Sequence, residues 1–476
     1  MKQTWQPRGS SDPLSYTCTC SQPGQVLLFY RYFSSPPSLP SAFQHLASEP
    51  ANLSTFHTNL TQSLGLKGKI RVAKEGFNIT VGGSLDSISR YIEACTRHWS
   101  FAGVEGLESE QGRRALFKPS PGCACVFASA KSGDEEYEES TGANVRVCEE
   151  ITPMGVSSYI PRDWDIVESL SPAEFHQRLC SRLGSDADGL EKENVLVDVR
   201  NHYESRIGYF VNPLTGEPAL RPQVRRFGQW PQFVKAHLSF SPRLVKDVPP
   251  SNREDGKPDE RITKGTQYMT YCTGGVRCEK GSRFLAENIA LEGSSVCTLQ
   301  GGIQAYLMWM DEEIKAGRKT PQDSLFKGKN YVFDARGSTG LTTSSNPGPG
   351  DANAEKVARC HMCGKAEDRL SKCRSQGCHL ILVICEECED GADPRCCRSC
   401  LELDTRAGGE LVAGRAQSRP ICECEMEREL RLWGDKRVKS LRSQGKGRKK
   451  MKGEKFLESS ADVPVDDINI RIKIFD

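Results

Sequence analysis

The chain has 476 residues, with 64 lysines and arginines against 62 aspartates and glutamates, and a formal net charge of +2. This length predicts two to four domains. The near-neutral balance excludes a polyanion-binding surface spread over the whole chain, so any nucleic-acid contact must use local basic patches. No apolar run approaches the roughly 18 residues of a membrane-spanning helix, and the N-terminus lacks the apolar segment of a secretory signal. We therefore expect no membrane contact.

The first part of the chain alternates short strands with helices. Residues 1–24 read as a loose leader, and a domain is expected over 25–160. Its expected elements are a strand, a helical region, two strands joined by a turn, a helix and a final strand, over 26–33, 40–64, 68–73, 78–81, 85–99 and 145–148. This order is typical of a ferredoxin-like α+β domain. The acidic, small-residue-rich stretch 129–143 is expected to be a solvated insertion.

From Ser171 onward the pattern changes. Ser171 followed by Pro172 predicts the start of a helix. Apolar runs then recur between helical segments, at 194–200, 269–272 and 296–299. Such runs predict a parallel sheet that is covered on both faces, in an α/β domain over 171–326. A short strand over 327–334 and a Gly/Ser/Pro-rich linker complete the segment up to residue 355.

One loop carries the chemistry of this second domain. An apolar strand runs into Cys272, and after four intervening residues Arg277 precedes a helical pattern. The helix start, the inward-turned backbone N–H groups and the arginine all favour a thiolate at Cys272. In such sheets the site lies at the carboxyl ends of the strands, where Cys272 falls. The intervening residues, whose two glycines let the backbone approach the sulfur, are Thr273, Gly274, Gly275 and Val276.

Four residues outside the loop core have more than one interpretation. Asp198 and Arg200 end a strand beside the loop, and they either orient Arg277 or bind substrate, or else form an ion pair that braces the loop. Cys278 either resolves an oxidised or persulfidated catalytic thiol or only opens the next helix. Glu75 either touches substrate or only shapes a hairpin turn.

Eleven of the 21 cysteines lie between Cys360 and Cys424, in a module that we place at 356–425. Paired Cys-x2-Cys turns present two thiolates to one tetrahedral zinc ion, and a reactive thiol elsewhere favours a reducing compartment over a disulfide framework. We expect two structural zinc ions, bound by Cys360, Cys363, Cys373, Cys378, Cys385, Cys388, Cys397 and Cys400. Interleaved pairing and a contribution from His379 stay open, and the roles of Cys422 and Cys424 are ambiguous.

The segment 434–455 is strongly basic, with nine lysines and arginines between residues 436 and 452. It either holds RNA phosphates, acts as a nuclear address, or is a solvated tail.

Several of these segments resemble known sequences. The run from Cys272 to Arg277 is the Cys-x4-Arg form of rhodanese domains, one residue shorter than the Cys-x5-Arg loop of cysteine phosphatases. The segment 198–208 resembles the Asp-x-Arg and Tyr-Glu-x3-Gly pattern of rhodanese domains. Residues 72–83 and 332–336 resemble the N-terminal hairpin and the post-rhodanese strand of one branch, the tRNA uridine hydroxylases. Over roughly 24–400 the chain resembles the larger eukaryotic members of this branch, which have an acylphosphatase-like N-terminal domain.

The resemblance implies oxygen-dependent hydroxylation of uridine at the tRNA wobble position. Cys272 would be the essential thiol, molecular oxygen a co-substrate and tRNA the partner. We expect a cytoplasmic enzyme, with the nucleus and organelles left open. The alternative is a sulfurtransferase, in which Cys272 forms a persulfide from thiosulfate or another sulfur donor. A third interpretation is a zinc-dependent adaptor with a vestigial rhodanese fold, against which the intact Cys272 and Arg277 argue.

Overall fold

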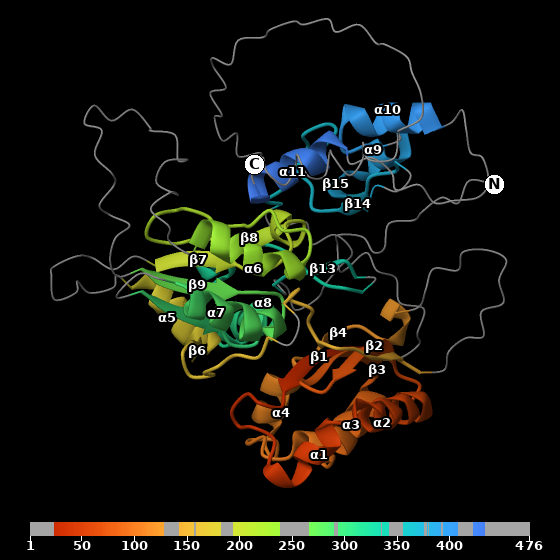
Figure 1. Ribbon diagram of the computed structural model, residues 1–476, viewed down its shortest axis with the longest axis vertical. Coiled ribbons are helices and arrows are strands. Elements are labelled where there is room, and N and C mark those ends of the chain that lie inside the picture. The colour runs from red at the N-terminus through yellow and green to blue at the C-terminus, as the bar shows by residue number, and fades with distance from the viewer. Residues whose placement is uncertain are drawn as a thin grey trace, which may run out of the picture. The chain divides into compact units, whose positions relative to one another are not determined.

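The computed structural model divides into two compact units, Met1–Glu355 and Lys356–Asp476 (Figure 1). The residues that it describes are 23–127, 142–156, 159–181, 194–238, 266–289, 294–334, 336–341, 356–375, 378, 380–391, 394–407 and 422–433. Nearly all of the expected leader and acidic insertion, and the whole basic segment 434–455, lie outside the described residues.

A five-stranded sheet forms the first part of unit 1, in the order β4-β1-β3-β2-β5. Its strands are β1 (Gly24–Tyr32), β2 (Lys67–Ala73), β3 (Gly76–Ser84), β4 (Ser120–Pro121) and β5 (Asn144–Val147). β1 pairs antiparallel with both β3 and β4, and β2 pairs antiparallel with β3. Because helices join β1 to β2 and β3 to β4, this is the ferredoxin-like arrangement predicted from the sequence.

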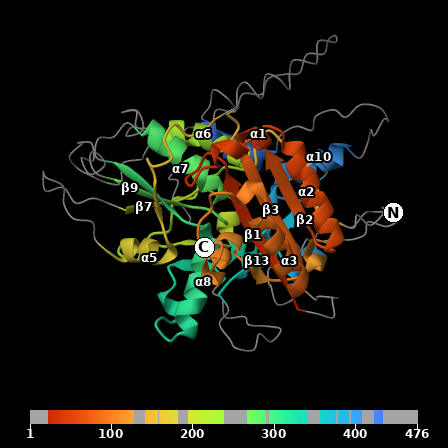
Figure 2. The same cartoon turned by 90° about the horizontal axis from the view of Figure 1, so that it is seen from below.

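Helices cover one face of this sheet (Figures 1 and 2). They are η1 (Ser41–Phe43), α1 (Gln44–Ala47), α2 (Pro50–Ser63), α3 (Leu85–Thr96), η2 (Trp99–Phe101) and α4 (Glu110–Phe117). Helix α3 begins after Ser84, whose side chain accepts a hydrogen bond from the backbone N–H of Ser87. Its apolar face, with Ile88 and Tyr91, is buried in the same core as Phe29 of β1.

The closing strand differs from the prediction. The run expected at 145–148 does form a strand, β5, but this strand pairs in parallel with β2 at one edge of the sheet. The strand beside β1 is instead β4, in which Ser120 and Pro121 lie opposite Val26 and Gln25. Two residues are too few to produce a period-two pattern, so this strand could not be predicted from periodicity.

A four-stranded parallel sheet, in the order β6-β10-β9-β7, forms the second part of unit 1. The strands are β6 (Glu168–Leu170), β7 (Asn194–Asp198), β9 (Gln267–Tyr271) and β10 (Ser295–Leu299), and the main helices are α5 (Pro172–Cys180), α6 (Trp230–Phe233), α7 (Val276–Asn288) and α8 (Gly302–Lys315). On one face Tyr271 packs with Phe175 of α5 and Tyr306 of α8. On the other face the Thr270 hydroxyl lies 2.6 Å from that of Ser282 in α7. The sheet is therefore covered on both faces, as the apolar runs predicted.

Short elements connect these layers. They are η3 (Ala124–Phe127), η4 (Glu204–Arg206), β8 (Gly208–Phe210), η5 (Phe227–Gln229), the π-helical turn η6 (Val234–Leu238), η9 (Pro321–Asp323), β11 (Phe326–Gly328), β12 (Asn330–Tyr331) and β13 (Ser338–Thr339). The single strand predicted over 327–334 is thus two short strands. Gly328, with a φ of 77°, turns the chain between them, and β11 pairs with β8 while β12 pairs with β13.

Unit 2 is small and rich in cysteine. Its elements are β14 (Leu370–Lys372), β15 (Ile381–Val383), α9 (Glu386–Gly391), α10 (Arg398–Ala407) and α11 (Glu423–Trp433). The buried apolar cluster contains Leu380, Leu382 and Ile384 together with several cysteines. So few aliphatic side chains make a weak core, which favours stabilisation by metal. In neither unit do the described residues include a helix with the length and apolarity needed to cross a membrane.

Candidate active site and metal centres

Cys272 directly follows β9, at the carboxyl end of the strand, and α7 begins at Val276. Gly275 is the N-cap of this helix and has a φ of 98°, which favours glycine. Its backbone N–H donates to Sγ of Cys272 at 3.2 Å. The thiol therefore lies at the N-terminal end of α7, and it is fully buried.

Opposing effects act on the pKa of Cys272. Burial alone raises this pKa, but the Cys278 thiol, the Arg277 guanidinium and the backbone N–H groups of both residues favour the anion. Together they lower the pKa from 9.0 to about 6, so Cys272 is mainly thiolate at neutral pH. Burial and the neighbouring Cys272 instead raise the pKa of Cys278 well above its ordinary value. Of these two thiols, only Cys272 is placed to react as an anion.

The Arg277 side chain is held by a residue that sequence analysis did not assign to it, Glu204. Nη1 and Nη2 of Arg277 donate to Oε1 and Oε2 of Glu204 at 2.6 and 2.7 Å. The Thr273 hydroxyl donates to the same carboxylate at 2.9 Å. Although burial opposes ionisation, the Arg277 charge and these hydrogen bonds lower the pKa of Glu204. The carboxylate therefore connects η4 to both ends of the Cys272 loop.

Asp198 and Arg200 pair with each other, and both are buried. Nη2 of Arg200 lies 2.6 Å from Oδ2 of Asp198 and also donates to the Gly208 carbonyl at 2.6 Å. This geometry favours the bracing ion pair over direct contact with substrate. Residues 334 and 336 repeat the motif, because Arg336 binds Asp334 and also donates to the Pro121 carbonyl of β4 at 2.7 Å.

A second glycine turn supports the loop from the side of α8. The backbone N–H of Ile303 donates to the Cys272 carbonyl at 2.9 Å, and that of Gln304 donates to the Thr273 carbonyl at 3.0 Å. Gly302 has a φ of 66°, and a Cβ atom there would lie 2.4 Å from the Cys272 carbonyl oxygen. This close approach requires glycine.

Strand β1 of the first domain covers the loop with alternate side chains. A Cβ atom on Gly274 would lie 2.7 Å from Leu28, and one on Gly275 would lie 2.5 Å from the Tyr30 hydroxyl. The Tyr32 hydroxyl donates to the Val276 carbonyl at 3.2 Å. Alternate residues of a strand share one face, so Leu28, Tyr30 and Tyr32 all point toward the loop. They contact Gly274, Gly275 and Val276 in that order.

An ion cluster around Lys280 also joins the two domains. Its ammonium lies 2.7 Å from Oε2 of Glu75 and 2.8 Å from Oε2 of Glu150, and the lysine is 1% exposed. Oε1 of Glu75 accepts a hydrogen bond from the backbone N–H of Ile151 at 2.8 Å. Glu75 therefore contributes to the contact between the domains as well as to its hairpin.

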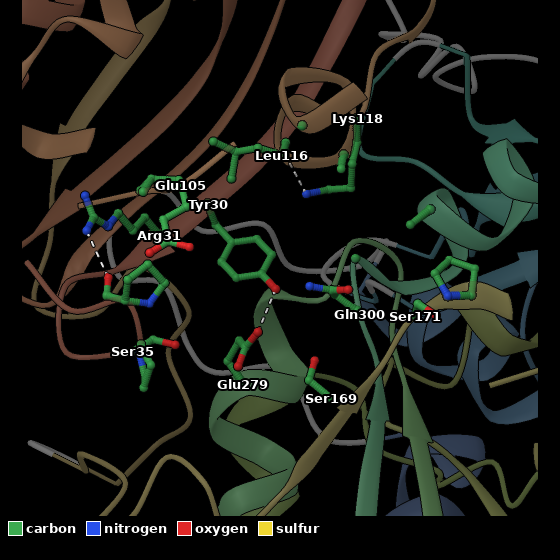
Figure 3. A pocket seen from close by; sticks show the side chains of 18 of the residues that line it. Tyr30, Arg31, Ser35, Glu105, Leu116, Lys118, Ser169, Ser171, Glu279 and Gln300 are labelled. Carbon is green, nitrogen blue, oxygen red and sulfur yellow. Dashed lines mark hydrogen bonds between the residues drawn. The ribbon is translucent and has the colours of Figure 1, made fainter. Parts of the chain in front are cut away.

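A cavity of about 900 Å³ is lined by both domains. Its lining includes Tyr30 and Gly301, which pack against Gly275, but no residue from Cys272 to Arg277. In Figure 3 the Tyr30 side chain points toward Glu279 of the second domain, and the Lys118 ammonium is turned toward Leu116. The Tyr30 hydroxyl donates to Oε1 of Glu279 at 2.9 Å. Burial lowers the pKa of Lys118 to about 8, against the opposing influence of Cys272 and Glu279. The ammonium donates to the Leu116 carbonyl at 3.0 Å, and no carboxylate of the described residues forms an ion pair with it.

Comparison with known families gives matches in both units. A family model described as Rhodanase C-terminal matches residues 327–401, and one described as a UPF0176 acylphosphatase-like domain matches residues 24–120. The chain thus has an acylphosphatase-like N-terminal domain and a segment that matches the C-terminal region of rhodanese-type proteins. The parallel sheet with its Cys-x4-Arg loop lies between these two matched segments.

Individual relatives extend over both domains of unit 1. The rhodanese-like domain-containing protein 6 of Arabidopsis thaliana is 29% identical over 380 residues, which are 79% of this chain and 52% of that protein. A protein named tRNA uridine(34) hydroxylase from Bacillus cytotoxicus is 25% identical over 380 residues, 80% of this chain and 88% of the relative. Another of that name from Streptococcus sanguinis is 28% identical over 388 residues, 79% of this chain and 88% of the relative. The match thus spans about half of the plant protein and most of the bacterial ones.

The cysteines of unit 2 form groups with metal-ligand spacing. In each group the Sγ atoms lie within 4.8 Å of one another. The groups are Cys360, Cys363, Cys385 and Cys388; Cys373, Cys378, Cys396 and Cys400; and Cys396, Cys397, Cys400 and Cys422. All eight expected zinc ligands belong to them, and the pairing is interleaved. Cys396 and Cys422 are not among those eight, although the sequence leaves Cys422 ambiguous, and His379 lies outside the described residues.

Proposed function

We propose that this protein hydroxylates a uridine of tRNA, with Cys272 as the reacting thiol. The Cys-x4-Arg loop, which places the Cys272 thiol at the N-terminal end of α7, is the observation that carries the proposal. An enzyme that acts on a base takes it out of the stack into an enclosed pocket, and a volume of about 900 Å³ accommodates a nucleotide. The bacterial relatives named tRNA uridine(34) hydroxylase, which match about four-fifths of this chain, support the same substrate.

Lys118 and Tyr30 are the groups that we assign to the substrate. The buried Lys118 ammonium uses one N–H group on the Leu116 carbonyl, and an ammonium has further N–H groups that can bind a phosphate or a uracil carbonyl oxygen. The Tyr30 ring, 5.1 Å from the Lys118 ammonium, offers a surface on which a base can stack. Arg277 is occupied by Glu204, so we assign it to positioning the loop and favouring the thiolate.

In this proposal the partner is tRNA, the enzyme works in the cytoplasm, and molecular oxygen is the co-substrate. One oxygen atom enters the uridine, and the other is reduced to water by two electrons from an external thiol reductant, which is oxidised to a disulfide. Cys278 has no direct role, because its raised pKa keeps it protonated.

The test is nucleoside analysis of tRNA from cells that lack the protein. The hydroxylated uridine should disappear, and it should return with the wild-type chain and with Cys278→Ser but not with Cys272→Ser. Labelled oxygen gas should place one labelled atom in the modified nucleoside. Unchanged tRNA in the deletion strain would overturn the proposal.

A sulfurtransferase is the second candidate, because the Cys-x4-Arg loop and the lowered pKa of Cys272 also suit a persulfide. Thiosulfate:cyanide assays on the same variants separate the two. Rapid thiosulfate turnover that depends on Cys272, together with unchanged tRNA in the deletion strain, would favour the sulfurtransferase over the tRNA hydroxylase.

A further inference from the structure

Two of the four-cysteine groups in unit 2 overlap. Both the group with Cys373 and Cys378 and the group with Cys397 and Cys422 contain Cys396 and Cys400. The remaining group, built on Cys360, shares no member with them. Because the two groups share two cysteines, together they contain six different cysteines and not eight.

The spacing around Cys396 suits a shared ligand. Its Sγ lies 3.3 Å from that of Cys400, 3.6 Å from Cys422, 3.8 Å from Cys397 and 3.9 Å from Cys378. A zinc–sulfur bond is about 2.3 Å, so the sulfurs of one tetrahedral ion lie about 3.8 Å apart. Cys396 therefore has ligand-like neighbours on two sides. Four-coordinate zinc accepts only four of the six thiolates, so one ion cannot use them all.

We propose that unit 2 binds three zinc ions, two of them in a binuclear cluster in which the thiolates of Cys396 and Cys400 bridge the ions. Cys373 and Cys378 complete one tetrahedron, and Cys397 and Cys422 complete the other. The third ion is bound separately by Cys360, Cys363, Cys385 and Cys388.

Charge favours the bridged arrangement at this position. Two separate tetrathiolate sites would hold eight thiolates against two divalent ions, a net charge of about −4, whereas six thiolates give about −2. Cys396, Cys400 and Cys422 are at most 5% exposed, and buried net charge is costly. Sharing two thiolates therefore halves the charge that this small core must accommodate.

The starts of helices α10 and α11 hold Cys422 close to the other ligands of the binuclear cluster. Cys397 precedes α10 and Cys400 lies in its first turn, where the helix N-terminus favours anionic sulfur. The Ser399 hydroxyl accepts a hydrogen bond from the backbone N–H of Glu423 at 2.9 Å, which fixes the start of α11 against α10. Cys422 is thereby held beside Cys396. Cys424 instead donates to the Cys396 carbonyl at 3.0 Å, so we leave it out of the ligand set.

Native mass spectrometry of the full chain gives the first test. The wild-type chain should carry three zinc ions. Cys360→Ala should carry two, and Cys396→Ala should retain only the separate ion. Cys424→Ala, the matched control within the same cluster, should still carry three. Two ions in the wild-type chain would overturn the proposal.

Cadmium substitution tests the bridge itself and needs no variant. One-dimensional and correlated ¹¹³Cd spectra of the full chain should contain three resonances. Two of them should show scalar coupling to each other, since coupling between metals passes through a shared thiolate, and the third should be uncoupled. Resonances without any mutual coupling would refute the bridge, even with three metals bound.

Discussion

Glu204 holds Arg277 through two hydrogen bonds of 2.6 and 2.7 Å, one to each carboxylate oxygen. Glu204 is fully buried, and Arg277 is 7% exposed. The carboxylate belongs to η4 and the guanidinium to α7, so the pair ties the segment after β7 to the Cys272 loop. The positive charge that favours the Cys272 thiolate is therefore held in one place by a neighbouring segment.

Replacing Glu204 by Gln should leave Arg277 buried without a counter-ion. Breaking a buried ion pair by removing one partner typically costs about 3–5 kcal/mol. We expect a loss of this order in the free energy of unfolding of unit 1, measured by chemical denaturation.

The control for this change is Glu93→Gln. Glu93 pairs with Arg97 at 2.6 Å, but both side chains are more than half exposed. Exposed pairs contribute about 0–1 kcal/mol, so this variant should unfold almost like the wild type. If both substitutions lowered the free energy of unfolding by the same amount, burial would not explain the stabilisation by the Glu204–Arg277 pair.

Gly302→Ala should disrupt the Cys272 loop, and Gly317→Ala should not. Both glycines have nearly the same φ, 66° and 69°, so both variants carry the strain of a left-handed residue, about 1–2 kcal/mol. Only at residue 302 would the new Cβ meet the Cys272 carbonyl, at 2.4 Å, whereas nothing lies within 4 Å at residue 317. We expect tRNA modification to be lost in Gly302→Ala and kept in Gly317→Ala. Equal activity in both would contradict the supporting role of the second glycine turn.

The parts of this structure that the sequence predicted are those with a strong local signal. Residues 267–271 are all buried, and the corresponding apolar run predicted a central parallel strand. The cysteine spacings predicted metal-binding groups in the same way. In contrast, the pairing of Glu204 with Arg277 joins residues 73 positions apart, and no periodic pattern records such a contact.

The sequence of β1 does contain a signal for its contact with the Cys272 loop. Residues 26–33 are almost continuously apolar, although one face of a ferredoxin-like sheet commonly meets solvent. Such a run indicates a strand that is covered on both faces. In the structure Leu27 and Phe29 enter the core while Tyr30 and Tyr32 face the second domain.

Activity should follow a bell-shaped pH profile if Cys272 reacts as a thiolate and Lys118 acts as a cation. The pKa of Cys272 is lowered to about 6, so activity should rise as pH increases through 6. Burial lowers the pKa of Lys118 to about 8, so activity should fall as pH increases through 8. A profile that rises only near pH 9 would show that Cys272 has an ordinary thiol.

Variants at residue 118 test whether deprotonation of Lys118 causes the fall in activity above pH 8. Lys118→Arg keeps its charge above pH 8, so activity should persist at higher pH. Lys118→Met should lower activity by about 100-fold, the usual loss when one charge-stabilising donor is removed. Lys315→Met, at an exposed lysine in the last turn of α8, should change neither limb. An alkaline limb that is the same in Lys118→Arg and the wild type would exclude Lys118 from this role.

The basic segment gives a prediction that separates RNA chemistry from small-molecule chemistry. Nine lysines and arginines lie between residues 436 and 452, in a stretch poor in acidic residues. If they contact tRNA phosphates, a chain truncated at Gly434 should bind tRNA more weakly and with less dependence on salt. Each lost contact to single-stranded phosphate should reduce the log–log slope by about 0.7. Thiosulfate turnover should be the same in both chains, because it depends on the Cys272 loop. An unchanged salt slope would remove this segment from tRNA binding and leave the cavity residues to account for it.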